Sequence, residues 1–249
     1  MGQVTFNIWR GSSATKGAFQ EYTTEITEGM VVLDAVHQIQ ATDAQDLAVR
    51  WNCKAGKCGS CSAEINGRPK LMCMTRMSDI KTDSPVTIEP MKAFPLIKDL
   101  VTDVSWNYRV KKTVKKFKPR KPDHADGTWY IDQRDADRVQ EFRKCIECFL
   151  CQDVCHVLRE HHMHGQFSGP RHMVYNAALE MHPLDIEDRR EDLKVKDNIG
   201  LCNITKCCTT VCPENITITD NAIIPLKERV ADKYYDPLKW FFRLFKSKH

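Results

Sequence analysis

The chain has 249 residues, of which 42% are hydrophobic and 28% are charged, and its formal net charge at pH 7 is +4. This hydrophobic content is enough for a folded core, and the absence of an apolar run of about eighteen residues excludes a membrane-spanning helix. The N-terminal residues alternate as in a strand, so we expect no signal peptide.

The first 105 residues are predicted to form a small mixed domain. Alternating apolar residues favour two hairpins and one further strand, and one stretch has its apolar side chains at helical spacing. The second hairpin would turn at Asn66-Gly67. A sheet crossed by one helix is the arrangement of a β-grasp fold. The expected elements are strands at residues 4–9, 19–26, 62–65, 71–74 and 86–88 and a helix at residues 30–40.

Residues 106–122 are predicted to connect this domain to a second one. Within them, residues 109–121 contain eight basic residues and no acidic one. Such a block can contact nucleic acid or an anionic membrane surface, but it is more often a solvated connector, which is our prediction. Phe117 is its only aromatic residue, and this poor aromatic interleaving disfavours a nucleic-acid partner.

Residues 123–249 are predicted to form an all-α domain, which makes the fold class α+β. Three stretches have helical composition: residues 135–144, 171–181 and 222–233. A further helix would begin at Asp236-Pro237, with aspartate as N-cap and proline in the first turn. Its apolar face would pack on the chain's own core or on a partner near lipid headgroups, and consists of Leu238, Phe241, Phe242 and Phe245.

Twelve cysteines in three groups of four carry the chemistry. In a chain of this length with no export signal, they favour metal binding over a disulfide framework. The first group has the spacing of plant-type ferredoxins, and Gly56 and Gly59 let its loop wrap closely around a cluster. We predict a [2Fe–2S] centre; a zinc knuckle is the alternative, although this spacing is unusual for zinc. The predicted ligands are Cys53, Cys58, Cys61 and Cys73.

The second group has the C-x2-C-x2-C-x3-C spacing of bacterial ferredoxins, in which the fourth cysteine binds the other cluster. Placed on the same template, the third group ends at Cys212-Pro213 and has Thr205 where its second cysteine should stand. One site therefore has four thiolates and should hold [4Fe–4S], whereas the other lacks one thiolate and should hold [3Fe–4S]. The predicted ligands are Cys145, Cys148, Cys151 and Cys212 for [4Fe–4S], and Cys155, Cys202 and Cys208 for [3Fe–4S].

Cys207 is out of register with this template. We interpret it as a buried thiol, and the alternative is a fourth ligand, which would strain the loop because Cys208 is adjacent. The chain has no glycine-rich nucleotide loop, no P-loop and no nucleophile elbow, and it offers no place for flavin. We therefore predict that it relays electrons between partners and does not itself transform a carbon substrate.

At these residues the chain resembles the iron–sulfur subunit of succinate dehydrogenase and its relative fumarate reductase, and it is most like succinate dehydrogenase. The resemblance covers nearly the whole chain, including residues 50–61, residues 143–148, the gap at Thr205 and the Cys212-Pro213 ending. It implies a subunit of a succinate:quinone oxidoreductase of the tricarboxylic acid cycle. An FAD-containing flavoprotein would oxidise succinate to fumarate, and electrons would pass through [2Fe–2S], [4Fe–4S] and [3Fe–4S] to menaquinone or ubiquinone.

The resemblance also implies one or more membrane-anchor subunits, with or without haem, and a peripheral position on the cytoplasmic face of the bacterial membrane. Many family members have proline after the fourth cysteine of the second group and a tryptophan soon after it, but here His156 follows Cys155 and no tryptophan appears. Either the anchor subunits build the quinone site alone, or four residues of this chain face the quinone: His156, Arg159, Asn203 and Thr205.

Two alternatives remain. One is the cluster subunit of a fumarate reductase or of another flavoprotein-linked complex. The other, more remote, is a zinc-binding nucleic-acid module, which would be colourless where clusters make a protein brown.

Overall fold

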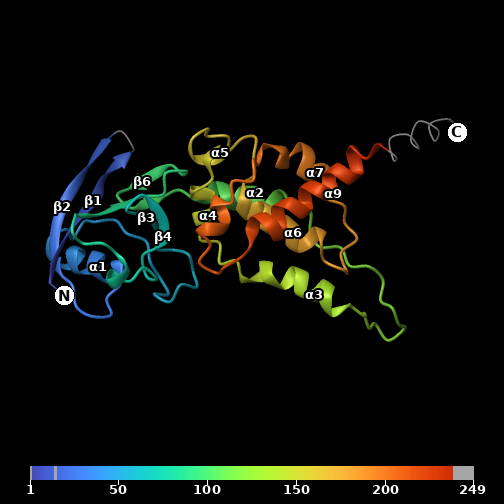
Figure 1. The fold of residues 1–249 in the computed structure, drawn as a ribbon, viewed down its shortest axis with the longest axis horizontal. Coiled ribbons are helices and arrows are strands. Elements are labelled where there is room, and N and C mark those ends of the chain that lie inside the picture. Colours follow the sequence, from blue (N-terminus) through green and yellow to red (C-terminus); the bar gives the residue numbers. More distant parts are fainter. Residues whose placement is uncertain (1, 14–15, 238–249) are drawn as a thin grey trace.

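The computed structural model describes residues 2–13 and 16–237, with a sheet region at one end and a helical region at the other (Figure 1). The main sheet has five strands in the order β2-β1-β5-β3-β4. β1 (Gln3–Ser13) pairs antiparallel with β2 (Lys16–Glu25) and parallel with β5 (Val86–Glu89). The predicted first hairpin and the strand at residues 86–88 are therefore confirmed.

The core of the sheet region forms between β1 and α1 (Val32–Thr42). Phe6 and Ile8 of β1 and Val36 of α1 have no exposed surface. Each such side chain contributes roughly 1.5–3 kcal/mol relative to its exposed state. The alternation of β1 and the helical spacing of α1 thus direct their apolar faces into one core, as the sequence predicts.

The second hairpin lies earlier in the chain than predicted. β3 (Ser62–Ile65) pairs with β4 (Arg68–Leu71), and the expected second strand at residues 71–74 is wrong. The reason is the turn, because Asn66 and Gly67 have φ of 49° and 71° and form a two-residue connection. Pairing therefore resumes at once, at Arg68. A short second ribbon, β6 (Leu96–Lys98) with β7 (Val101–Thr102), was not predicted.

The basic segment predicted as a solvated connector keeps most of its basic side chains exposed, as predicted, while its backbone is held against the fold. It begins within α2 (Ser105–Thr113) and continues as extended chain along the helical region. Arg189, which is fully buried, donates hydrogen bonds to the carbonyl oxygens of Lys115 and Lys116 at 3.0 and 2.8 Å. The same guanidinium pairs with the Asp185 carboxylate at 2.8 Å. These contacts fix the backbone of the segment against the helices.

The helical region confirms the three predicted helices. Their observed forms are α3 (Gln133–Gln140), followed by a 3-10 turn (Glu141–Lys144); α6 (Pro170–Glu180); and α9 (Ile224–Tyr234), preceded by a π-helical turn (Ile218–Ile223). α7 (Arg190–Val195), the one-turn helices α4 (Leu150–Asp153), α5 (His156–Arg159) and α8 (Cys207–Thr210), and a 3-10 turn at Ile199–Leu201 complete it. A further 3-10 turn, Met77–Asp79, packs in the sheet region.

The predicted C-terminal helix with its apolar face at Leu238, Phe241, Phe242 and Phe245 lies outside the described residues. Within residues 2–13 and 16–237, no helix has the length and apolar character needed to cross a bilayer.

The two regions are packed together. The hydrophobic core of the sheet region includes Cys148, Phe149 and Leu150, which belong to the second cysteine group and to α4. Trp106, in α2, packs against this core and against the core of the helical region. The cysteine groups therefore lie at and next to the junction between sheet and helices.

Candidate metal centres

The first cysteine group lies on the loop between α1 and β3. Gly56 and Gly59 both have φ of 66°, a left-handed conformation that glycine adopts without strain. The backbone N–H groups of Ala55 and Lys57 donate to the sulfur of Cys53 at 3.4 and 3.3 Å. Such N–H donation to sulfur is what a cluster thiolate requires, because it stabilises the negative charge of the bound cluster.

The four thiols of this group differ in burial and in acidity. Cys61 and Cys73 are buried, whereas Cys53 is exposed. Burial, together with the neighbouring Cys73 thiol, raises the pKa of Cys61 to about 12. At Cys58 the effect of burial is outweighed by hydrogen bonds with Ser60 and Cys53, and the pKa falls to about 7. Because a cluster binds thiolates, loading of this site must release protons.

The second and third groups surround two enclosed cavities. The fourth cysteine of each group faces the cavity of the other group, so the two runs exchange partners as the ferredoxin spacing predicts. One cavity is lined by Cys145, Cys148, Cys151 and Cys212, and the other by Cys155, Cys202, Cys207 and Cys208. The structure therefore brings together the predicted [4Fe–4S] ligands, and separately the predicted [3Fe–4S] ligands.

The two groups also share a backbone path that their spacing alone does not reveal. In each, the second and the fourth residue after the first cysteine has positive φ, and a one-turn helix, α4 or α8, begins at the fifth. These residues are Glu147 (φ 56°), Phe149 (φ 62°), Ile204 (φ 61°) and Lys206 (φ 62°). A β-branched residue such as Ile204 rarely adopts this conformation, at a cost of roughly 1–2 kcal/mol. On this shared path Thr205 occupies the place of Cys148.

The donor set fits iron–sulfur clusters. Burial raises the pKa of Cys148 to about 12 and those of Cys155 and Cys208 to about 11, so these thiols are neutral until a metal displaces their protons. The N–H of Ile216 donates to the sulfur of Cys212 at 3.4 Å, as in the first loop. Four enclosed sulfurs at one site and three, with Cys207 beside them, at the other can hold clusters of unequal iron content.

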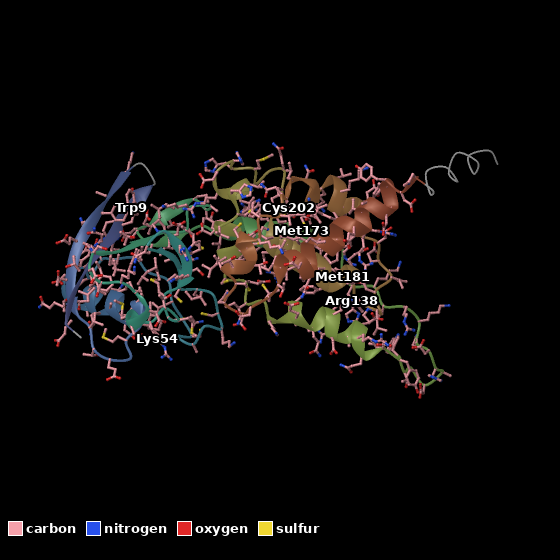
Figure 2. The ribbon with its side chains drawn as sticks, in the orientation of Figure 1. Trp9, Lys54, Arg138, Met173, Met181 and Cys202 are labelled. Atoms are coloured by element: carbon pink, nitrogen blue, oxygen red, sulfur yellow. The ribbon has the colours of Figure 1, made fainter. Side chains whose placement is uncertain are left out.

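The first and second sites touch. A Cβ placed on Gly59 would come within 2.5 Å of the Cα of Cys148, so only glycine permits this approach. The hydroxyl of Ser62 donates to the carbonyl oxygen of Cys148 at 2.9 Å. Figure 2 shows Lys54 of the first loop low at the sheet end and Cys202 higher, over the helical region. The first site thus contacts the second, and the second and third are linked by the cysteine that each group places at the other's cavity.

Three of the four residues considered for a quinone site lie together. The Asn203 amide nitrogen is 2.7 Å from Nε2 of His156, and both side chains line the cavity that contains Thr205. Arg159 does not line this cavity, and its guanidinium pairs with the Glu64 carboxylate of β3 at 2.6 Å. The predicted burial of Cys207 is wrong: α8 begins at this residue and leaves it half-buried.

Sequence reasoning missed two polar clusters that hold the sites. Glu64 has no exposed surface and pairs with Arg159 and, at 3.4 Å, with Lys92, which ties the sheet to α5. Next to Cys151, the buried amide of Gln152 lies 3.2 Å from Nδ1 of His172. These contacts join residues far apart in the sequence, so no local pattern indicates them.

Comparisons with known proteins agree with this geometry. Residues 5–108 match the model of a 2Fe-2S iron-sulfur cluster binding domain, and residues 141–216 match that of a 4Fe-4S dicluster domain. The chain is 33% identical over 202 residues to the fumarate reductase iron-sulfur subunit of Mycobacterium tuberculosis, covering 80% of each chain.

The relatives differ in length. The chain is 32% identical over 218 residues to an uncharacterized iron-sulfur protein of Methanococcus maripaludis, with 85% of this chain aligned but only 42% of that protein. In the structure described as the Mycobacterium smegmatis Sdh1 complex in the apo form, one chain superimposes with a TM-score of 0.90 at 57% identity, covering 95% of this chain and 98% of that chain.

Proposed function

Because the chain belongs to the family of iron–sulfur subunits of succinate dehydrogenase and fumarate reductase, we propose that it relays electrons within a membrane-bound succinate:quinone oxidoreductase. The observation that supports this most is the exchange of partners between two cysteine groups of unequal thiol number. A single-metal or purely structural site has no need of three separate thiol sets in series. Bound iron–sulfur clusters supply one-electron transfer at the three sites.

We assign to each cluster the cysteines whose thiols surround the same site. The loop of Cys53 would be the entry point, since Cys53 is exposed while the other eleven cysteines are half-buried or buried. The backbone N–H groups of Ala55, Lys57 and Ile216 would tune the bound clusters by donating to their sulfurs. The proposed sets are Cys53, Cys58, Cys61 and Cys73 for [2Fe–2S]; Cys145, Cys148, Cys151 and Cys212 for [4Fe–4S]; and Cys155, Cys202 and Cys208 for [3Fe–4S].

The partners follow from this assignment. An FAD-containing flavoprotein would face the first loop, and membrane-anchor subunits, with or without haem, would face the third centre on the cytoplasmic side of the membrane. The domain division that goes with it is residues 1–105 for [2Fe–2S], residues 106–122 as connecting segment, and residues 123–249 for the other two centres.

For the quinone we propose His156 and Asn203, with Thr205 beside them, as the contribution of this chain. Their side chains are in contact and lie next to the proposed [3Fe–4S] ligands. Arg159 contributes through its pairing with Glu64, which fixes α5 and hence His156. Menaquinone and ubiquinone both offer carbonyl oxygens that an imidazole or an amide can hydrogen-bond.

Fumarate reduction is the second candidate, favoured by the similarity to the Mycobacterium tuberculosis subunit named fumarate reductase. Succinate oxidation and fumarate reduction use the same sites, so the two functions are distinguished by comparing their rates. In the intact complex, succinate-dependent quinone reduction faster than quinol-dependent fumarate reduction supports the first candidate, and the reverse supports the second.

The quinone assignment is tested with the variants His156→Ala and Asn203→Ala in the intact complex. Loss of a hydrogen bond worth about 1.4 kcal/mol should slow quinone reduction roughly tenfold. Succinate oxidation with ferricyanide should stay unchanged, because it does not require the quinone site. His124→Ala, far along the chain from the cysteines, is the control. Unchanged quinone reduction in both test variants refutes the assignment.

A further inference from the structure

Cys207 is left over when the other eleven cysteines are assigned to the three centres. It is half-buried and lines two spaces at once. One is the enclosed cavity that Cys155, Cys202 and Cys208 surround, and the other is an open cleft of about 780 Å³ between β4 and the helices α4, α5 and α8. Cys207 therefore stands between solvent and the third centre.

The repeated backbone path shows how unusual this placement is. Cys207 begins α8 as Leu150 begins α4, so the two residues are structural counterparts. Leu150 is 1% exposed and lines the cleft, but it does not line the cavity of Cys145 and Cys148. The third group thus has Thr205 at the place where the second group has Cys148. Two residues later it has a thiol that reaches the cavity, where the second group has Leu150.

The sulfur of Cys207 also lies beside the position of the missing ligand. Its Sγ is 3.2 Å from Oγ1 of Thr205, the residue in the second ligand place. Cys207 also lines the same enclosed cavity as Cys155 and Cys208. The Cys207 thiol is therefore close to two of the three proposed ligands and to the place of the missing ligand at Thr205.

We propose that Cys207 is a conditional fourth ligand, which lets the third centre bind one ferrous ion and become a four-iron cluster. The inference rests on the proposed [3Fe–4S] assignment. In the one-electron-reduced state the [3Fe–4S] core has no net charge; it takes up Fe²⁺, the Cys207 thiol binds that iron and releases its proton to solvent, and the core becomes [4Fe–4S]²⁺. Iron, sulfur and charge balance without a further oxidant or reductant.

Such an exchange would link the electron path to iron supply. Ferrous ion can reach Cys207 from the cleft without passing the buried ligands, because the cleft is open to solvent in the described residues. Reduction potential depends on cluster type, so uptake of iron would change the potential of the last centre before the quinone. The half-buried thiol would thus make the reduction potential of this centre depend on the supply of ferrous ion.

The test uses the intact complex, reduced by dithionite without oxygen and incubated with isotopically labelled Fe²⁺, after which unbound iron is removed. Mössbauer spectroscopy of the labelled iron and native mass spectrometry of the chain then give the number of labelled iron atoms bound per chain. We expect one labelled iron per chain in the wild type and loss of the paramagnetic signal that the oxidised three-iron centre gives before treatment. Cys207→Ala should take up no labelled iron and keep that signal.

A double variant serves as a positive control for iron uptake. In Thr205→Cys combined with Cys207→Ala, the thiol stands at the template position, so uptake of one iron should return and shows that the assay detects it. The inference is overturned if the wild type takes up no iron while this double variant does, or if Cys207→Ala takes up iron as the wild type does.

The proposed function fails in a different way. A third centre that contains no iron in any variant removes the assigned function and this inference together. A wild type isolated already with four irons at this centre, and three in Cys207→Ala, supports Cys207 as a ligand while it overturns the three-iron assignment.

Discussion

Replacing Gly59 by alanine should push the first cysteine loop away from the second cysteine group. The new Cβ would lie 2.5 Å from the Cα of Cys148 and 2.9 Å from its backbone nitrogen. Because these are backbone atoms, no side-chain rotation relieves the contact, and one of the two segments has to move. The first and second centres would separate, and electron transfer between them should slow.

The expected loss of stability has two parts. Alanine at φ of 66° costs about 1–2 kcal/mol, and relief of the contact costs about 1–3 kcal/mol more. Gly67→Ala isolates the first part, since Gly67 has φ of 71° and a Cβ there meets nothing within 4 Å. Gly56→Ala is a control within the loop, because its Cβ meets only the flexible and exposed side chain of Met74.

The thermal stabilities of the glycine variants are compared by the temperature at which the visible circular dichroism of the [2Fe–2S] centre is lost. The measurement is made without oxygen at a fixed heating rate. A difference of about 2 kcal/mol between Gly59→Ala and Gly67→Ala corresponds to roughly 4–8 °C if the whole chain melts as one unit, and to about twice that if the first domain melts alone. Freeze-quench spectroscopy after succinate addition should show the first centre reduced while the second fills more slowly. Equal melting of the two variants, with normal filling of the second centre, would refute the close packing.

Two further predictions concern buried charge. Arg159→Ala removes the closest cation from the buried Glu64 carboxylate and should destabilise the protein by about 3 kcal/mol, measured by urea unfolding. Lys92→Ala, which removes a half-exposed ammonium at 3.4 Å and keeps the Arg159 pairing, should cost under about 1 kcal/mol. Burial raises the pKa of Asp197 to about 6, so its favourable contribution is complete below its unfolded pKa of about 3.9 and is lost as pH rises through about 6. Asp197→Asn removes this dependence, and its stability relative to wild type should rise by roughly 1.5 kcal/mol between about pH 5 and pH 8, above which the difference stays constant.

The first of these predictions fails if the arginine and lysine variants lose equal stability. The second fails if the stability difference between Asp197→Asn and wild type is flat, or falls, over that pH range. Asn176, whose amide donates to the Asp197 carboxylate at 3.2 Å, provides a control, because Asn176→Ala should destabilise the protein at every pH.

The pattern of apolar residues and cysteines within a segment correctly predicted the elements that depend mainly on that segment's own sequence. β1 alternates, α1 has helical spacing, and the cysteine spacing places Cys155 and Cys212 at each other's sites. The register of the second hairpin was wrong because the hydrophobic residues after Leu71 read as strand, whereas the two-residue turn at Asn66 had already fixed the pairing.

The remaining features depend on contacts between distant residues. α2 was missed because its composition reads as a charged connector, although Asn107 on its inner face is buried and its carbonyl oxygen lies 2.9 Å from Nε2 of His172. The pairing of Glu64 with Arg159 joins residues 95 positions apart. The half-buried position of Cys207 depends on where α8 begins, which follows from the strained backbone at Lys206. None of these has a periodic signal.

The most direct test of the central claim is the iron content of the anaerobically isolated complex, counted per flavin, together with the spectroscopic type of each centre. Clusters of two, four and three irons predict about nine irons per chain, with a paramagnetic three-iron signal in the oxidised state. Zinc in place of iron, or iron confined to the first cysteine group, would contradict the account.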